Sequence, residues 1–162
     1  MVTCSGIVEI RPYAERDAAA TLTTFLAAVT VTASAHYSVE QIAAWSAAHE
    51  RDKNAWNRVR ANLGTIVATV DEDVAGFSDV GAAGYIDMLF VSPRFGRRGV
   101  GSALLLEVER SARVAGATAL STNASITARP FFEGRGFHVT VEQHPVTRGV
   151  RMTNYRMVKS LD

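Results

Sequence analysis

The segment from Tyr85 to Ser102, YIDMLFVSPRFGRRGVGS, decides the fold. Its first seven residues are almost continuously apolar, which is typical of a strand covered on both faces, and Asp87 is their one charge. Pro93 ends this strand, and a helix follows that begins near Gly99 and ends at Gly116. The apolar face of that helix consists of Val100, Leu104, Val108 and Ala112. The segment therefore predicts a buried strand, a glycine turn and an amphipathic helix.

The glycine turn is a candidate anion site. Gly99 and Gly101 allow a ligand to approach the backbone closely, and the first amides of a helix have no intrahelical partner. The helix dipole adds partial positive charge, and Arg94, Arg97 and Arg98 add full charges, so a diphosphate is a suitable ligand. The alternative is a plain strand-to-helix connection. The turn lacks the Gly-Lys-Ser/Thr of a P-loop and the third glycine of a Rossmann fingerprint.

The first 64 residues are predicted to be mostly helical. A short strand at 7–11 is stopped by Pro12, Asp17 is the expected N-cap of the first helix, and Gly64 ends the third. Their apolar stripes are Leu22, Phe25, Leu26 and Val29 in the first helix and Trp56, Val59 and Leu63 in the third.

The start of the second helix carries the sharpest local signal. Ser38 and Gln41 have the spacing of a capping box, while Tyr37 and Ile42 occupy the positions of a hydrophobic staple. This helix is therefore predicted to begin at about Val39.

Short β-like runs dominate the rest of the chain. Strands are expected at 65–70, 74–78, 119–123, 137–141 and in a last segment ending near Val158, with a short helix at 127–133. We find no internal repeat or linker, and therefore expect one domain over residues 1–162.

Composition limits the classes of partner. Seventeen basic and sixteen acidic side chains give a net charge of +1 without a run of five like charges, so we expect no nucleic-acid surface. No apolar run is long enough for a membrane span, and the first ten residues do not resemble a secretory signal. With the single Cys4, this predicts a soluble, cytoplasmic protein, and the scattered histidines favour no metal site.

Two motifs, in the right order, carry a resemblance to a known family. Val91-Ser92-Pro93 followed by Arg97-Arg98-Gly99-Val100-Gly101 is similar to the acetyl-CoA signature of the GNAT (Gcn5-related) N-acetyltransferases, and residues 128–137, ARPFFEGRGF, resemble their second motif. Residues 28–38 and 41–45 resemble the uncharacterised YafP-type branch. The resemblance spans nearly the whole chain. It implies an α/β (α+β) fold with a mixed, mostly antiparallel central sheet of about six or seven strands, splayed at the acetyl-CoA site and flanked by helices.

The resemblance also implies where the co-substrate acetyl-CoA binds. Its pantetheine arm would enter the gap between strands 85–91 and 119–123, and a backbone amide near Phe90 would hold the thioester carbonyl. The implied binding residues are Leu89, Phe90, Val91, Gly96, Arg97, Arg98, Gly99, Val100, Gly101, Ser102, Ser125 and Phe132.

Three positions depart from the family pattern. Gly96 stands where a Gln or Arg is usual, and Ser125 replaces a frequent Asn. Phe132 occupies the place of a tyrosine that protonates the departing thiolate in many relatives, and Phe has no proton to donate. Water, Ser125 or another hydroxyl would supply the proton, or the thiolate would leave unassisted, because a thiol pKa of about 8.5 makes it a fair leaving group.

Asp87 is the candidate general base. A carboxylate inside an apolar strand would have its pKa raised by desolvation, but pairing with an arginine is an equal alternative. Tyr37 lies in the region that resembles the acceptor-site lid and is the candidate proton donor, with the staple contact as its alternative role. His36 is a further titratable neighbour.

We therefore expect an N-acetyltransferase that moves an acetyl group from acetyl-CoA to an amine of a small molecule, peptide or protein by direct attack in a ternary complex. Family members are often dimers, so a homodimer is expected, without nucleic-acid or membrane partners. An acyl-CoA-binding sensor with little catalysis is the alternative that Phe132 motivates. A structural domain in which the glycine turn is only a connection is the third.

Overall fold

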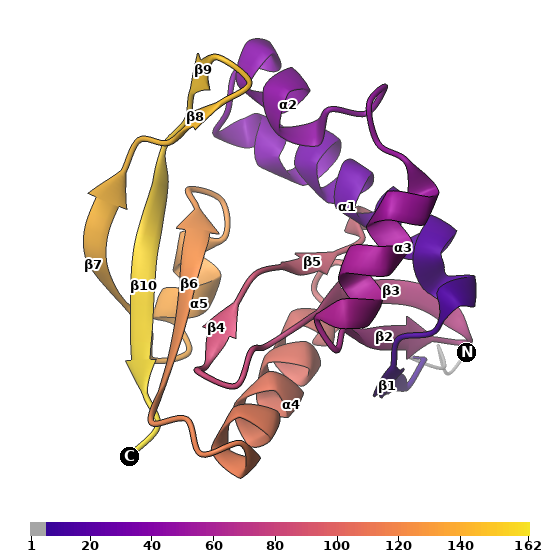
Figure 1. Cartoon of the computed structure of the whole chain (residues 1–162), viewed down its shortest axis with the longest axis vertical. Helices are drawn as coiled ribbons and strands as arrows, with labels where there is room; N and C mark the ends of the chain where they lie inside the picture. The colour runs from indigo at the N-terminus through magenta and orange to yellow at the C-terminus, as the bar shows by residue number, and fades with distance from the viewer. Residues whose placement is uncertain (1–5) are drawn as a thin grey trace, which may run out of the picture.

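The computed structural model describes residues 6–162, so Cys4 lies outside the described residues. The chain forms two four-stranded sheets and a two-stranded hairpin (Figure 1). The first sheet contains, in spatial order, β1 (Val8–Pro12), β2 (Ile66–Val70), β3 (Asp73–Ser78) and β5 (Leu89–Val91). The second contains β4 (Tyr85–Ile86), β6 (Ala119–Ser125), β10 (Asn154–Ser160) and β7 (His138–Gln143), and the hairpin contains β8 (Val146–Thr147) and β9 (Val150–Arg151). Only β4 and β6 pair in parallel among these strands, so the mixed, mostly antiparallel fold class is confirmed.

Helices pack on both faces of the first sheet. The α-helices of the described chain are α1 (Ala18–Ala27), α2 (Val39–Ser46), α3 (Lys53–Asn62), α4 (Val100–Val114) and α5 (Arg129–Glu133). Val67 of β2 packs in one core cluster with Phe25 and Trp56, whereas its neighbour Ala68 packs with Val100. Because successive strand residues point to opposite faces, α1 and α3 lie on one face of the sheet and α4 on the other.

The helix α4 lies in the angle between the two sheets (Figure 1). Leu104 joins the core of the first sheet, while Leu105 and Val108 join that of the second, with Leu120 and Met157. The predicted helix after the glycine turn is therefore confirmed, and its apolar face packs against both sheets.

The predicted continuous strand at 85–91 is wrong in one respect. The chain leaves the second sheet after Ile86 and joins the first at Leu89. At the break, the Asp79 carboxylate accepts the amides of Asp87 at 2.8 Å and Met88 at 3.2 Å. A side chain thus replaces a strand partner at the break, and the sheet that was expected to be splayed at this place is divided here into two.

The N-terminal helices show one confirmation and two corrections. The capping box of α2 is present, with Ser38 and Gln41 each accepting the other's backbone amide. Asp17 makes no side-chain cap to α1, because its carboxylate binds Arg11 and the Ala14 amide instead. In the predicted stripe of the third helix only Trp56 is buried: Val59 and Leu63 are exposed, and Arg60 is buried instead.

The helical run Glu15–Ala35 is long and apolar enough to cross a membrane, with a mean hydropathy of 1.5. This is weak evidence for a span, because a core helix of a soluble protein has the same properties. Phe25 and Val29 in this run are buried in the core that faces the first sheet.

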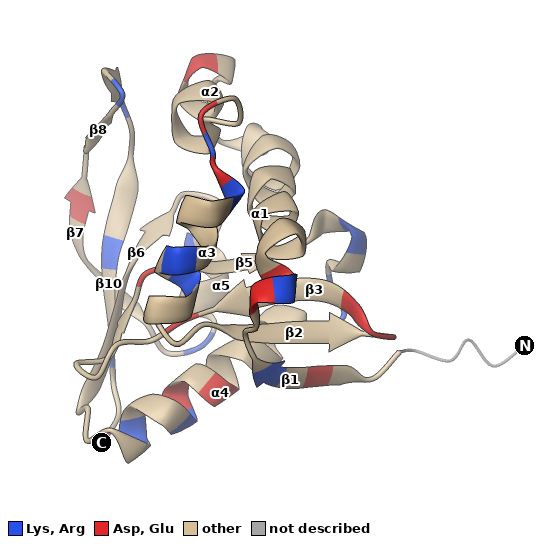
Figure 2. Ribbon diagram, turned by 45° about the vertical axis from the view of Figure 1, so that its right-hand side comes forward, with Lys and Arg blue, Asp and Glu red and all other residues tan. Residues whose placement is uncertain are grey.

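Charges of both signs alternate along the helices and strands (Figure 2). On α4, Arg110 pairs with Glu107 and Arg113 with Glu109, which are one turn apart on the helix. These pairs keep the outer face of α4 polar, while its buried face packs against the two sheets.

Candidate functional site

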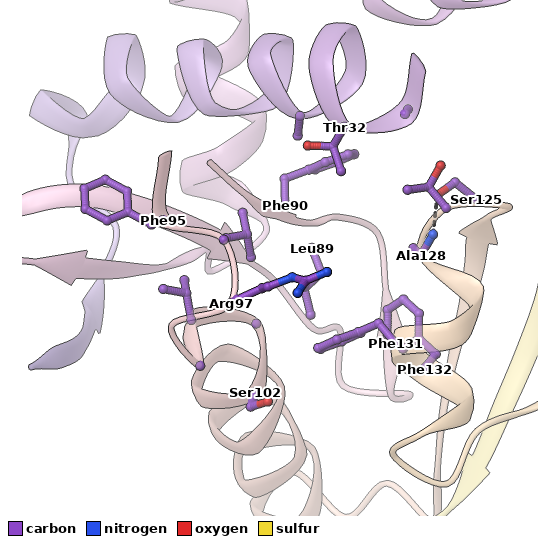
Figure 3. A pocket seen from close by; sticks show the side chains of 18 of the residues that line it. Thr32, Leu89, Phe90, Phe95, Arg97, Ser102, Ser125, Ala128, Phe131 and Phe132 are labelled. Atoms are coloured by element: carbon purple, nitrogen blue, oxygen red, sulfur yellow. Dashed lines mark hydrogen bonds between the residues drawn. The ribbon is translucent and has the colours of Figure 1, made fainter. Parts of the chain in front are cut away.

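A cavity of about 390 Å³ lies where β5 and β6 separate (Figure 3). Every predicted cofactor-binding residue except Arg98 lines it. Arg98 instead places its guanidinium over the Phe95 ring, 5.6 Å from the ring centroid. We call this the first cavity.

The N-terminus of α4 borders the first cavity. Gly99 adopts a left-handed backbone conformation with φ of 79°, and a Cβ added there would meet no atom within 4 Å. The Gly99 carbonyl accepts the Ala103 amide, so the amides of Val100, Gly101 and Ser102 have no partner within the helix. The Arg97 side chain extends from the turn into the cavity (Figure 3). Free amides, the helix dipole and a guanidinium thus face open space, as an anion site requires.

The outer edge of β5 faces the same opening, because β5 is the last strand of its sheet. Hydrogen bonds from Ser92 to Ala75 and from Asp79 to Met88 fix the register with β3. Antiparallel pairs alternate, so the Phe90 amide points toward β3 and the amides of Leu89 and Val91 point outward. The amide expected near Phe90 is therefore that of a neighbour.

The wall opposite β5 comes from the end of β6 and from α5. Phe132 is buried against Phe131 and Phe137, with ring centroids 5.2 and 5.0 Å away, so this position adds apolar surface without a hydroxyl. The Ser125 hydroxyl accepts the Ala128 amide at 3.0 Å, which leaves its own proton available for donation.

Arg135 is a lining residue that the sequence analysis missed as a site residue. Its guanidinium donates to the Ser102 hydroxyl and to the Phe131 carbonyl, and it lies 3.9 Å from the centroid of the Phe131 ring. It thereby ties the loop after α5 to the first turn of α4. An arginine between Gly134 and Gly136 in the second motif was the available signal.

A second cavity of about 300 Å³ adjoins the first and shares Trp45, Phe90 and Ser125 with it. Asp87 and Tyr37, the two predicted catalytic residues, both line this second cavity. The structure therefore brings them together, beside the cofactor residues rather than among them.

The Asp87 carboxylate is paired with an arginine. Its Oδ2 accepts a hydrogen bond from Arg60 at 3.1 Å, and the buried Arg60 also binds Asp79 at 3.0 Å. The Asp87 side chain is 42% exposed, so it is not the enclosed carboxylate of an apolar strand that the base hypothesis assumed. The arginine-paired alternative matches this geometry, and the role of Asp87 as base stays a prediction.

Tyr37 makes two structural hydrogen bonds. Its hydroxyl donates to the Thr153 carbonyl at 2.5 Å and accepts the Ile126 amide at 2.9 Å. Burial raises the pKa of the Tyr37 phenol, and Ile42 packs against the small core cluster that contains Tyr37, in keeping with the staple pattern. Its proton is committed to a carbonyl, so Tyr37 can act as a proton donor only after that bond breaks.

His36 contacts the lining of the first cavity. Its Nδ1 lies 2.9 Å from the hydroxyl of Thr127, which lines that cavity. Within residues 6–162, no cluster of three or more His, Cys, Asp or Glu side chains could hold a metal ion.

Known proteins share both the sequence and the fold. Residues 33–159 match the acetyltransferase (GNAT) domain model. The uncharacterized N-acetyltransferase YafP of Escherichia coli K12 is 40% identical over 150 residues, covering 93% of this chain and 94% of that protein. A GCN5-related N-acetyltransferase from Rhodopseudomonas palustris superimposes with a TM-score of 0.90 at 32% identity, over 99% of this chain and 98% of that one. The PaiA N-acetyltransferase of Thermoplasma acidophilum, in complex with coenzyme A, superimposes with a TM-score of 0.75 at 20% identity, over 95% and 99%.

The splayed sheet, the glycine turn and these relatives define the protein as an acyltransferase. The chain belongs to the GNAT acetyltransferase family, as the two sequence motifs indicated.

Proposed function

We propose that this protein transfers an acetyl group from acetyl-CoA to the amine of a small molecule or peptide. The observation that carries the proposal is the junction of the two cavities at Phe90 and Ser125. One cavity has the features of a CoA site and the other is open to an acceptor, so a thioester and an amine would meet at the junction. This arrangement supports direct attack within a ternary complex.

In the proposed complex the CoA diphosphate binds the free amides of α4, with Arg97 as its counter-charge. The pantetheine arm lies along the open edge of β5, where unpaired strand groups accept an extended ligand. The outward amides of Leu89 and Val91 are the donors available to the thioester carbonyl. Coenzyme A in the Thermoplasma relative of the same fold supports this use of the site.

The chemical step needs a neutral amine. After the ammonium loses a proton, its nitrogen attacks the thioester carbon, the C–N bond forms and the C–S bond breaks. The nitrogen then loses a second proton, and one of the two protons ends on the thiolate of CoA while the other goes to solvent. Asp87, through water, is the proposed base, and Ser125 or water the proposed proton donor, because Phe132 has none to give.

A second candidate function is an acyl-CoA sensor with weak catalysis. Phe132 in the first cavity favours it, because the position lacks a hydroxyl. Calorimetric titration with acetyl-CoA, followed by a thiol-release assay with amines, peptides and aminoglycosides, separates the two. Binding with turnover supports the transferase, binding without turnover favours the sensor, and no binding contradicts both.

A further inference from the structure

The second cavity contains two arginines that the acetyl transfer itself does not require. Arg51, which follows α2, and Arg148, in the turn of the β8–β9 hairpin, both line it. Burial and the nearby cations Arg148 and Arg60 lower the pKa of Arg51. The positive charge of Arg51 is therefore repelled by these neighbours. An anion placed here would relieve that repulsion.

Both guanidinium groups are held in place by hydrogen bonds that involve only some of their N–H groups. Arg51 donates Nε–H to the Ser46 carbonyl at 2.9 Å and one Nη2–H to the Trp45 carbonyl at 3.1 Å. Arg148 donates one Nη1–H to the Ala44 carbonyl at 2.9 Å and Nε–H to Glu50 at 3.1 Å. Each guanidinium has five N–H groups, so each keeps donors with no partner within residues 6–162.

The charge balance favours a carboxylate. Arg148 has the exposed Glu50 as its counter-ion, whereas Arg51 has no carboxylate within salt-bridge distance in the described part of the chain. The one carboxylate in the lining, that of Asp87, is paired with Arg60, so Arg51 is the lining cation that a ligand would neutralise. A monoanion held by two forked N–H donors neutralises it, and the carboxylate is the planar group that matches a guanidinium fork.

The rest of the lining describes the body of the ligand. Phe25, Trp45, Phe90, Met88 and Met152 contribute apolar surface, and Phe90 also borders the junction with the first cavity. An acceptor that reaches from the arginines to the junction would place its amine at the thioester and its apolar part against these rings.

We propose that the acceptor is an amine that also carries a carboxylate, of the amino-acid class with an apolar side chain, and that Arg51 and Arg148 bind its carboxylate. This inference rests on the proposed function, and it names the acceptor class for that site. The amine nitrogen takes the acetyl group with the bond changes given above, while the carboxylate stays unchanged.

The test uses matched compounds that differ only at the carboxylate: L-phenylalanine, L-phenylalaninamide and 2-phenylethylamine, with the methionine series as a second set. Thiol release at saturating acetyl-CoA gives kcat/KM for each, corrected for the fraction of neutral amine. We expect the acids to exceed the amides by about 10-fold or more, because charge-assisted hydrogen bonds are worth about 1.5–3 kcal/mol. Titration of the CoA-loaded protein with the same compounds gives the same comparison without chemistry.

Variants assign the preference to residues. Arg51→Gln and Arg148→Gln should each lower the acid-to-amide ratio several-fold, whereas Arg58→Gln, at an exposed position of α3, should leave the ratio unchanged. If loss of the Arg51 contacts to α2 prevents the Arg51→Gln variant from folding, the Arg148→Gln variant still provides the test, because Arg148 lies on a surface hairpin.

Amides bound and acetylated as well as the acids, or a ratio unchanged in both variants, would overturn the carboxylate site. Turnover of amines that carry no carboxylate, without turnover of the amino acids, would also overturn the carboxylate site, but it would leave the proposed function standing. Failure to bind acetyl-CoA would contradict the proposed function instead.

Discussion

The Asp79 carboxylate accepts the backbone amide of Asp87 at 2.8 Å, at the point where the chain passes from one sheet to the other. Its second oxygen accepts the Met88 amide and the guanidinium of Arg60. One buried side chain therefore satisfies the donors that the break in the strand leaves without strand partners. The strand β5, which borders the first cavity, begins two residues after Asp87.

We expect Asp79→Ala to lower the free energy of unfolding by about 3–5 kcal/mol, because it leaves the buried Arg60 without its buried partner. Affinity for acetyl-CoA should also fall as the break loosens. Urea denaturation and calorimetry measure the two effects. The control is Asp73→Ala, which removes an exposed pair with Arg94 and should cost less than about 1 kcal/mol. Equal losses in both variants would show that Asp79 has no special role.

Gly99→Glu should abolish acetyl-CoA binding, because a carboxylate would occupy the space in front of the free amides of α4. Gly116→Glu is the matched control at the other end of the same helix. It also has a positive φ and no atom within 4 Å of an added Cβ, so it carries comparable backbone strain. Titration of both variants should show binding lost only in the first. Undiminished affinity in Gly99→Glu would remove the anion site from the turn.

Asp87→Asn should lower kcat more than it lowers acetyl-CoA affinity, if the carboxylate accepts the proton of the amine. Because the variant also removes an ion pair with Arg60, its unfolding free energy must be measured beside its kinetics. A loss of stability with unchanged kcat would leave Asp87 with a structural role alone.

Tyr37→Phe should lower the free energy of unfolding by about 1–3 kcal/mol, because the Ile126 amide loses its acceptor. Burial raises the pKa of this phenol, so the folded state favours the neutral form. That contribution is fully present below the unfolded pKa of about 10 and is lost as pH rises through the folded value. Denaturation curves at neutral and alkaline pH should show a smaller alkaline decline in the variant. An equally steep decline would mean that another group titrates.

The sequence predicted the elements whose determinants are local. The capping box of α2 and the helix that follows Gly99 both rest on residues within a few positions of one another. It failed where a distant partner decides. The apolar run 85–91 satisfied the pattern of one strand, and nothing near it indicated that Asp79 would end its pairing.

Candidate site residues divide in the same way. The binding set named from the motifs lines the first cavity except for Arg98, because the motifs fix one turn and one helix. The roles of Asp87 and Tyr37 stay predictions, as do the single domain over 1–162 and the cytoplasmic location. Arg135 was missed because its contact with Ser102 spans 33 positions.

The sequence by itself determined the glycine turn and the order of elements, because each follows from spacing along a short stretch, and its two motifs carried the resemblance to the family. Only the tertiary structure decided that Asp87 pairs with Arg60, that the Tyr37 proton is bound by a carbonyl 116 positions away, and that Arg51 and Arg148 share a cavity. These contacts depend on how helices and sheets pack. Packing brings together residues that lie far apart in the chain, and no spacing pattern in the sequence marks them as neighbours.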